Sequence, residues 1–293
     1  MALDPHSRWY PYRFVMPVLV LEGLFVAVPL AIGLYYSVHK ADYFQLAGFV
    51  GLDNYVRVLT SPVVRESLWA TLVFTVFSLA ITLGVGFALA LWLERDTRWN
   101  VFVRAVVLVP YTIAMLVGSL LLKWIFSRDG GILPMMLAPL GLGDVSILAD
   151  PQGAMAALVA NAVWRDSAFA MILLMAGLKG ISPQLYAAAR IDGASAWYRF
   201  RRITLPLLRV PILITVIRLA IHFVNVLTFA LVLTGGGPNN ATQTMGLTMY
   251  RMGFADFRLG PANALAILVL LFNLVLIAAL LRLFRERRPQ AVA

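Results

Sequence analysis

Polar and aromatic side chains interrupt three otherwise apolar stretches of the chain, and their types suit hydrogen bonding to a hydroxyl-rich solute. Amide, imidazole, guanidinium and carboxylate groups all bond to hydroxyls, and an indole ring can stack on a sugar ring. Residues of this kind inside a membrane are expensive and are therefore functional candidates. They are Asn161, Trp164, Arg165 and Asp166 in residues 153–178; Arg218, His222, Asn225 and Phe229 in residues 210–234; and Asn273 in residues 262–284.

The spacing in residues 210–234 is the most regular of the three. Arg218, His222, Asn225 and Phe229 are 4, 3 and 4 residues apart, which predicts one shared helix face. Three structural alternatives stay open. Arg218 can extend to the cytoplasmic edge, Arg165 and Asp166 can neutralise each other or satisfy a neighbouring subunit, and asparagines can hold helices together.

Catalytic and metal chemistry is not indicated. The chain contains 3 His and 0 Cys, and its histidines are far apart in sequence at His6, His39 and His222. The sequence therefore predicts no metal site, no catalytic residues and no enzymatic activity.

The elements that carry these residues must be membrane helices. Of the 293 residues, 61% are hydrophobic and only 13% are charged, against about 45–50% and about 25% in soluble domains. Mean hydropathy is +0.84. These values exclude an ordinary soluble protein and a disordered chain.

Six stretches are long enough to span a bilayer, for which about 20 apolar residues are needed. We expect an all-α integral membrane protein with one transmembrane domain over residues 1–293. The expected spans are residues 14–37, 67–93, 101–126, 153–178, 210–234 and 262–284. In the second span, a stripe of small residues ending at Gly86 predicts close helix packing.

The +10 net charge follows the expected topology. The N-terminus, residues 94–104, residues 179–209 and the C-terminus together carry +10, whereas the three opposite loops carry −1. Basic residues collect in cytoplasmic loops, so we expect both termini to be cytoplasmic. The basic tail, with Arg282 and Arg285, is expected to contact lipid headgroups. Nucleic acid is not needed to explain the basic charge.

The loop over residues 179–209 predicts two short helices at the membrane surface. Ser182 and Pro183 suit the start of the first helix. Gly193 suits the break between the helices, and Pro206 is expected to end the second one.

This loop resembles the cytoplasmic "EAA" loop of permease subunits of ABC importers. The family pattern is Glu-Ala-Ala, then Asp-Gly-Ala, then Ile-x-Leu-Pro; here Ala187 replaces the motif glutamate. The resemblance implies a helix pair that docks into a separate ATPase. The matching residues, which we expect to couple the two proteins, are Tyr186, Ala188, Ala189, Asp192, Gly193, Ala194, Phe200, Ile203, Leu205 and Pro206.

A second segment resembles the outer loop of carbohydrate-type permeases. It reads Leu233-Thr234-Gly235-Gly236-Gly237-Pro238, followed by Ala241-Thr242, Tyr250 and Phe254. It is similar to the first permease subunit of the maltose and glycerol-3-phosphate kind. The two resemblances together imply a type I ABC importer permease bundle in the cytoplasmic (inner) membrane.

The family resemblance also implies partners. The chain has no Gly-x-x-x-x-Gly-Lys-Ser/Thr phosphate loop, so ATP and Mg are expected on two ATPase subunits and no cofactor on this chain. A second homologous permease subunit, an extracytoplasmic substrate-binding protein, membrane lipid and a sugar-like substrate complete the expected partners. Nucleotide-driven closure of the ATPase would then bias alternating access.

Three other functions compete with this interpretation. A secondary transporter driven by an ion gradient would not need the coupling loop. A membrane-embedded enzyme would need a convergent acid–base or metal site. A purely structural role would leave the polar helix faces unexplained. The particular substrate is not specified by the sequence.

Overall fold

The computed structural model describes residues 10–43, 45–128, 130–141 and 146–284, and most of them are helical. The chain divides into two compact units, and the single transmembrane domain stays a prediction. Unit 1 comprises Met1–Ser61 and Met249–Leu271, and unit 2 comprises Pro62–Thr248 and Phe272–Ala293. Both termini, including Arg285 in the basic tail, lie outside the described residues.

Unit 1 begins with one long apolar helix. Helix α1 (Tyr10–Glu22) continues through a π-helical turn (Gly23–Ala27) into α2 (Val28–Ser37). Its prolines do not break it, in agreement with the expected first span. None of its most hydrophobic window is buried within the chain. Such a surface requires lipid or another protein around it.

The expectation of an all-α fold is wrong in the loop that follows α2. Strands β1 (His39–Asp42) and β2 (Gln45–Phe49) form an antiparallel hairpin, and helix α3 (Asp53–Thr60) follows it. Asn54 is buried and its Nδ2 donates to the carbonyls of Ser37 and His39, both at 2.9 Å. This amide satisfies two backbone acceptors where the helix turns into the hairpin.

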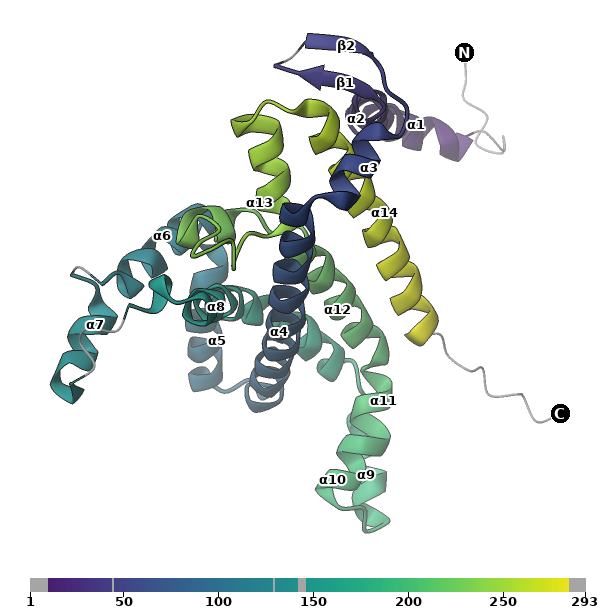
Figure 1. Ribbon diagram of the computed structural model, residues 1–293. Helices are drawn as coiled ribbons and strands as arrows, with labels where there is room; N and C mark the ends of the chain where they lie inside the picture. Colours follow the sequence, from purple (N-terminus) through teal and green to yellow (C-terminus); the bar gives the residue numbers. More distant parts are fainter. Residues whose placement is uncertain (1–9, 44, 129, 142–145, 285–293) are drawn as a thin grey trace. The chain divides into compact units, whose positions relative to one another are not determined.

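Unit 2 holds the remaining helices of the first half of the chain. They are α4 (Pro62–Trp92), α5 (Arg98–Thr112), α6 (Met115–Phe126), α7 (Ile132–Leu137) and α8 (Pro151–Lys179). Short 3₁₀ turns at Ala138–Leu140 and Ile147–Ala149 connect α7 to α8. Helix α8 packs against α4, α5 and α12 (Figure 1).

The second half of unit 2 contains the loop over residues 179–209 and the helices after it. Its elements are α9 (Pro183–Ile191), α10 (Ala196–Arg199), a π-helical turn (Phe200–Thr204), α11 (Leu205–Leu207), α12 (Arg209–Val224) and another π-helical turn (Ala230–Thr234). The chain then forms α13 (Met245–Tyr250), a π-helical turn (Arg251–Ala255) and α14 (Leu259–Phe284). The boundaries between the two units fall within α13 and within α14.

Among the described residues, four apolar helices are long enough to span a membrane, and two bent helix pairs bring the possible total to six. The four are Tyr12–Ser37, Pro62–Trp92, Pro151–Lys179 and Leu259–Phe284. They agree with the expected first, second, fourth and sixth spans within a few residues.

The other two expected spans are not continuous helices. Residues 101–126 are divided between α5 and α6, which bend by 97° because Ile113 and Ala114 adopt extended backbone angles. Residues 210–234 form a helix only as far as Val224, after which Val226 and Leu227 are non-helical. Hydropathy alone does not detect such breaks, because the residues at the breaks are also apolar.

The structure confirms the close helix packing that the stripe of small residues in the second span predicted, because α4 packs closely on α8. A Cβ atom added to Gly86 would meet the Ala170 Cβ and lie 3.0 Å from both the Met171 nitrogen and the Ser167 carbonyl oxygen. The two backbones can approach this closely only because Gly86 has no side chain.

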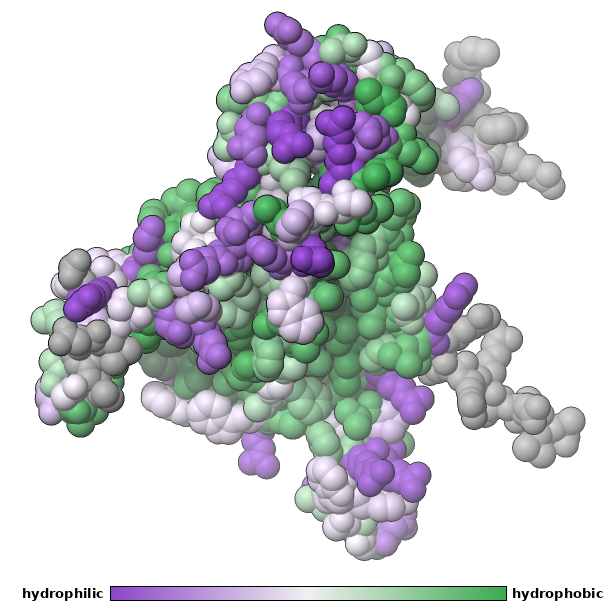
Figure 2. All heavy atoms as spheres, in the orientation of Figure 1, coloured by the Kyte–Doolittle hydropathy of each residue, from purple (hydrophilic) through white to green (hydrophobic). Residues whose placement is uncertain are grey.

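Two apolar clusters form the core of unit 2. The first includes Phe74, Leu158, Phe223 and Phe229, and the second joins Leu93, Met171, Leu174, Leu178 and Leu208. Hydrophobic side chains cover the middle of unit 2, whereas hydrophilic ones gather at the end formed by α9 and α10 (Figure 2).

We predict that Gly86→Ala lowers the melting temperature of the chain purified in detergent. The added methyl overpacks the contact between α4 and α8, at a cost of about 1–3 kcal/mol. Gly84→Ala is the matched control, because nothing lies within 4 Å of its added Cβ. Equal melting temperatures for the two variants would show that this close approach does not limit stability.

Candidate functional site

A buried carboxylate lies at the centre of the polar residues in unit 2. Asp166, midway along α8, is 1% exposed. Its Oδ1 accepts a hydrogen bond from Nη1 of Arg218 on α12 at 3.3 Å. This pair compensates the charge of the carboxylate, which would otherwise be very costly to bury. Arg218 therefore does not extend to the cytoplasmic edge.

His222 stands one helical turn beyond Arg218 and faces the other oxygen of the same carboxylate. Its Nε2 is 3.4 Å from Asp166 Oδ2. This distance suits an ion pair with a protonated imidazole, but the angles do not make a hydrogen bond, and both atoms are buried without a hydrogen-bond partner among the described residues. Two polar atoms in the cluster therefore retain unused hydrogen-bonding capacity.

Aromatic rings complete the surroundings of Arg218. Its guanidinium lies 4.4 Å from the ring centroid of Phe169, a cation–π distance. Its Nη2 donates to the hydroxyl of Tyr111 at 3.4 Å, and the Tyr111 ring stacks on Phe169. The sequence analysis did not identify Tyr111, because nothing in its local spacing connects α5 to α12.

Arg165 contacts backbone carbonyls, whereas its sequence neighbour Asp166 contacts ionisable side chains. Its Nη1 donates to the carbonyl of Pro110 at 3.3 Å and to that of Ile113. These carbonyls lie at the break between α5 and α6, where the helix no longer satisfies its own backbone acceptors. Arg165 and Asp166 therefore do not neutralise each other, as one of the alternatives had it.

The other two predicted residues of α8 face α6. Asn161 is buried and its Nδ2 donates to Ser119 Oγ at 2.9 Å, a contact that holds the two helices together. Trp164 is 38% exposed and lies against Gly118. Of the two, only Trp164 presents a substantial surface outside the core.

The predicted face from Arg218 to Phe229 is not one helix face, and this expectation is wrong. Asn225 ends α12, and its Nδ2 donates back to the carbonyl of Ile221 at 2.7 Å. Phe229 lies beyond the break and is fully buried, yet its ring centroid is 6.1 Å from that of His222. The non-helical turn thus brings Phe229 back to the cluster.

Asn273 on α14 contacts the end of α12. Its Nδ2 donates to Asn225 Oδ1 at 3.2 Å. Its own Oδ1 is buried without a hydrogen-bond partner among the described residues. The two asparagines form a second polar contact, one that the sequence did not pair.

The loop over residues 179–209 has the predicted helix–glycine–helix form. Helices α9 and α10 are joined at Gly193, whose φ of +75° favours glycine. Ser195 caps α10 by accepting a bond from the Tyr198 backbone nitrogen at 3.2 Å. The expected end at Pro206 is wrong. The proline lies in the first turn of α11, where its missing N–H is tolerated, and the helical path continues to Leu207.

The predicted coupling residues divide into an inward group, an outward group and three half-buried residues. Tyr186, Phe200 and Ile203 face the chain itself: the Tyr186 hydroxyl lies 2.9 Å from Thr204 Oγ1, Phe200 contacts Phe87 of α4, and Ile203 packs on the second apolar cluster. The outward group consists of Ala188, Asp192, Gly193 and Leu205, whereas Ala189, Ala194 and Pro206 are half-buried.

The most exposed apolar side chains of the loop were not among the predicted site residues. Ile191 is 87% exposed and Trp197 is 67% exposed. Both lie next to the helix break, at the end of unit 2 occupied by α9 and α10 (Figure 1). Exposed apolar groups at a loop tip are typical of a protein-binding surface.

The structure does not provide a metal centre in the part of the chain that it describes. No group of three His, Cys, Asp or Glu side chains lies close enough there to hold a metal ion. The cluster around Asp166 is therefore a hydrogen-bonding and charge-paired site.

Known proteins resemble this chain over most of its length. A family model for binding-protein-dependent transport system inner membrane components matches residues 63–288. The trehalose/maltose transport system permease protein MalF of Thermococcus litoralis is 31% identical, with 94% of each chain covered. The sn-glycerol-3-phosphate transport system permease protein UgpA of Agrobacterium fabrum is also 31% identical, with 96% of each covered.

A solved structure shows the same fold. It is a chain of a bacterial ABC transporter involved in the import of the acidic polysaccharide alginate, with a TM-score of 0.84, 23% identity and 96% of both chains covered.

We predict that Asp166→Leu destabilises the protein, because Arg218 is left without its counter-charge. The expected cost is about 3 kcal/mol, the low end for a broken buried pair because the Arg218 side chain is 34% exposed. The double variant Asp166→Leu/Arg218→Met removes both charges and should recover most of the melting temperature. A double variant as unstable as the single one would contradict the pairing.

Proposed function

This chain belongs to the family of binding-protein-dependent transport system inner membrane components, and on that premise we propose that it is the permease subunit of an ABC importer for a sugar or sugar-like solute. The observation that carries the proposal is the match over at least 94% of the chain to permeases named for trehalose/maltose and for glycerol-3-phosphate. The chain is a transport component, and ATP hydrolysis belongs to a separate subunit.

The proposed topology has six membrane spans in the inner membrane, with both termini cytoplasmic. Four long apolar helices supply four of the spans, α5 with α6 supplies another, and α12 with the π-helical turn at Ala230–Thr234 supplies the remaining one. The +10 charge of the loops assigned to the cytoplasm, against −1 for the opposite loops, supports this orientation.

The loop over residues 179–209 is proposed to receive the movement of the ATPase. The outward side chains at its tip, Ile191 and Trp197 together with Asp192, provide the docking surface. The inward side chains, Tyr186 and Phe200 among them, connect that surface to the apolar cluster beneath it. Because these contacts are short-range and apolar, a push on the tip moves the ends of α4 and α8 with it. ATP and Mg would be bound by the ATPase dimer.

The substrate pathway is proposed to run past the Asp166 cluster. Arg218 is already paired and Arg165 is bound to carbonyls, so neither cation needs an anionic substrate for its charge. The unused atoms, Asp166 Oδ2 and His222 Nε2, are an acceptor and a donor or acceptor of the kind that bind hydroxyl groups. Trp164 and Asn225 are exposed and complete the set. This arrangement supports a solute rich in hydroxyls.

The proposed assembly also contains a second homologous permease subunit, two ATPase subunits and an extracytoplasmic substrate-binding protein. The exposed apolar surface of Tyr12–Ser37 supports extensive contact with lipid or the second subunit. A groove of about 810 Å³ between α4 and α8, lined by Trp69, Phe77 and Met155 among others, offers a further apolar surface.

The test is uptake into proteoliposomes. The chain assembled with its second permease, ATPase dimer and binding protein should accumulate the sugar that the binding protein binds, and only with ATP on the ATPase side. The chain alone, under a proton or sodium gradient, should not transport. Gradient-driven uptake by the chain alone would instead establish a secondary transporter.

We further predict that Gly193→Val lowers the amount of substrate imported per ATP hydrolysed by the complete complex. No atom lies within 4 Å of an added Cβ, so the penalty is in the backbone. A β-branched residue at φ +75° costs about 1–2 kcal/mol or more. Gly193→Asn has a similar volume and tolerates this conformation, so it should couple normally. Normal coupling in both variants would remove the turn from the mechanism.

A further inference from the structure

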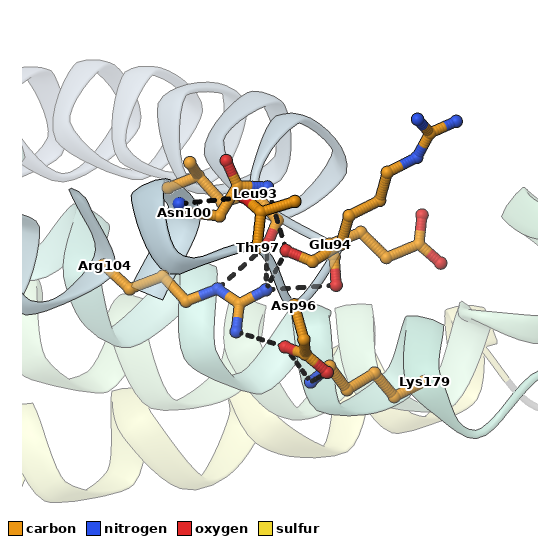
Figure 3. A network of polar contacts seen from close by, with 8 residues as sticks. Leu93, Glu94, Asp96, Thr97, Asn100, Arg104 and Lys179 are labelled. Atoms are coloured by element: carbon orange, nitrogen blue, oxygen red, sulfur yellow. Dashed lines mark hydrogen bonds and ion pairs between the residues drawn. The ribbon is translucent and has the colours of Figure 1, made fainter. Parts of the chain in front are cut away.

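The turn between α4 and α5 is joined to the end of α8 by one carboxylate. Asp96 lies in this turn, and Nζ of Lys179 donates to both of its oxygens at 2.8 Å (Figure 3). Arg104 of α5 donates from Nη1 to Asp96 Oδ1 at 2.7 Å. Asp96 therefore contacts two cations from two different helices, and both bonds are charge-assisted.

Arg104 also donates hydrogen bonds to backbone carbonyls of the turn. Its Nε donates to the carbonyl of Leu93 at 2.9 Å, and its Nη2 donates to the carbonyls of Glu94 and Arg95 at 3.0 Å and to that of Leu93 (Figure 3). These are carbonyls beyond the last helical bonds of α4. The Arg104 side chain is 12% exposed, so the turn is a rigid body rather than a loose connection.

Lys179 lies where helix α8 meets the loop that contains α9. It is the last residue of α8, and α9 begins four residues later at Pro183. The Lys179–Asp96 bridge thus ties the start of the cytoplasmic loop to the α4–α5 turn. Along the backbone, a movement of the loop enters α8 at Lys179.

Apolar packing already contributes to joining the turn to the loop, because Leu93, the first residue after α4, belongs to the same buried cluster as Ile181 and Leu208. A cavity of about 390 Å³ lies there, lined by Glu94 of the turn and by Tyr186, Arg190 and Arg199 of the loop. Phe200 also lines this cavity and contacts Phe87 of α4. The Lys179–Asp96 bridge adds a charged connection beside this packing, between the turn and the end of α8.

The bridge is ionised under physiological conditions. The ammonium of Lys179, and then the guanidinium of Arg104, hold the pKa of Asp96 below its ordinary value. A lowered carboxylate pKa means that the bridge is intact at neutral pH and is lost only as the pH falls through that lowered value.

We propose that Asp96 and Lys179 are a pair of positioning residues that makes the α4–α5 turn move together with the coupling loop. The inference rests on the proposed function of that loop. Force that arrives at α9 is then shared between α8 and the α4–α5 pair, instead of bending α8 at its end. An exposed ion pair contributes little to folding stability, so the pair acts on coupling and not on assembly.

The experiment measures ATP hydrolysed per substrate imported by the complete complex in proteoliposomes. Lys179→Asp places two carboxylates together and should raise this ratio by about threefold, the size of effect that an exposed ion pair can have. Lys179→Arg retains the bridge and should keep the wild-type ratio. Arg98→Asp makes the same charge change two residues from Asp96, on an exposed residue, and should also leave the ratio unchanged.

A second variant guards against a failure of Lys179→Asp to assemble. Asp96→Asn keeps the shape of the side chain and removes its charge, so it should raise the ratio in the same direction but less. A wild-type ratio in both variants would overturn the pairing, and so would a parallel fall of uptake and hydrolysis in both. If the wild-type complex itself shows no ATP-dependent uptake, the proposed function fails rather than this inference.

Discussion

The arrangement of unit 2 depends on the burial of one charge, the carboxylate of Asp166. An unpaired carboxylate in this position would destabilise the fold by far more than any single apolar contact stabilises it. Arg218 must therefore face α8, and this fixes the rotation of α12 about its axis. His222, one turn further along, is brought to the second oxygen as a consequence. The polar cluster and the helix packing thus have a common cause.

Helix α8 links the two ends of unit 2. In its middle, Arg165 and Asp166 hold the break of α5 and the face of α12. At its C-terminal end, Lys179 holds the α4–α5 turn. Close packing of Gly86 of α4 on Ser167, Ala170 and Met171 adds a third contact between these points. A helix fixed at three places is suited to carry a displacement along its length, which is what alternating access requires.

Much of this could be predicted from the sequence, because it depends on local patterns. Hydropathy located α4, α8 and the long helix of α1 and α2, and Pro183 with Gly193 located the helix pair of the loop. The partners of the charges could not be predicted in this way. Arg165 and Asp166 are neighbours in sequence, but successive residues on a helix do not face the same direction, so each finds a partner on a different helix.

The sequence patterns also did not predict the breaks in the helices. Ile113 and Ala114 are as apolar as their surroundings, and their extended backbone is tolerated because Arg165 satisfies carbonyls from another helix. The β-hairpin after α2 is short, and both faces of β2 are exposed, so it lacks the alternation that identifies a strand. Tertiary contacts decide both features.

The central claim is that the cytoplasmic loop and the α4–α5 turn move as one body when the ATPase closes. The natural chain contains 0 cysteines, so spin labels can be attached at Gln184→Cys and Arg98→Cys without other changes. Double electron–electron resonance should give the same distance between these two labels in nucleotide-free and in ATP-trapped complexes. A label on the second permease should move relative to both. A change of more than about 2 Å between the two labels, the size of a loop rearrangement, would contradict the account.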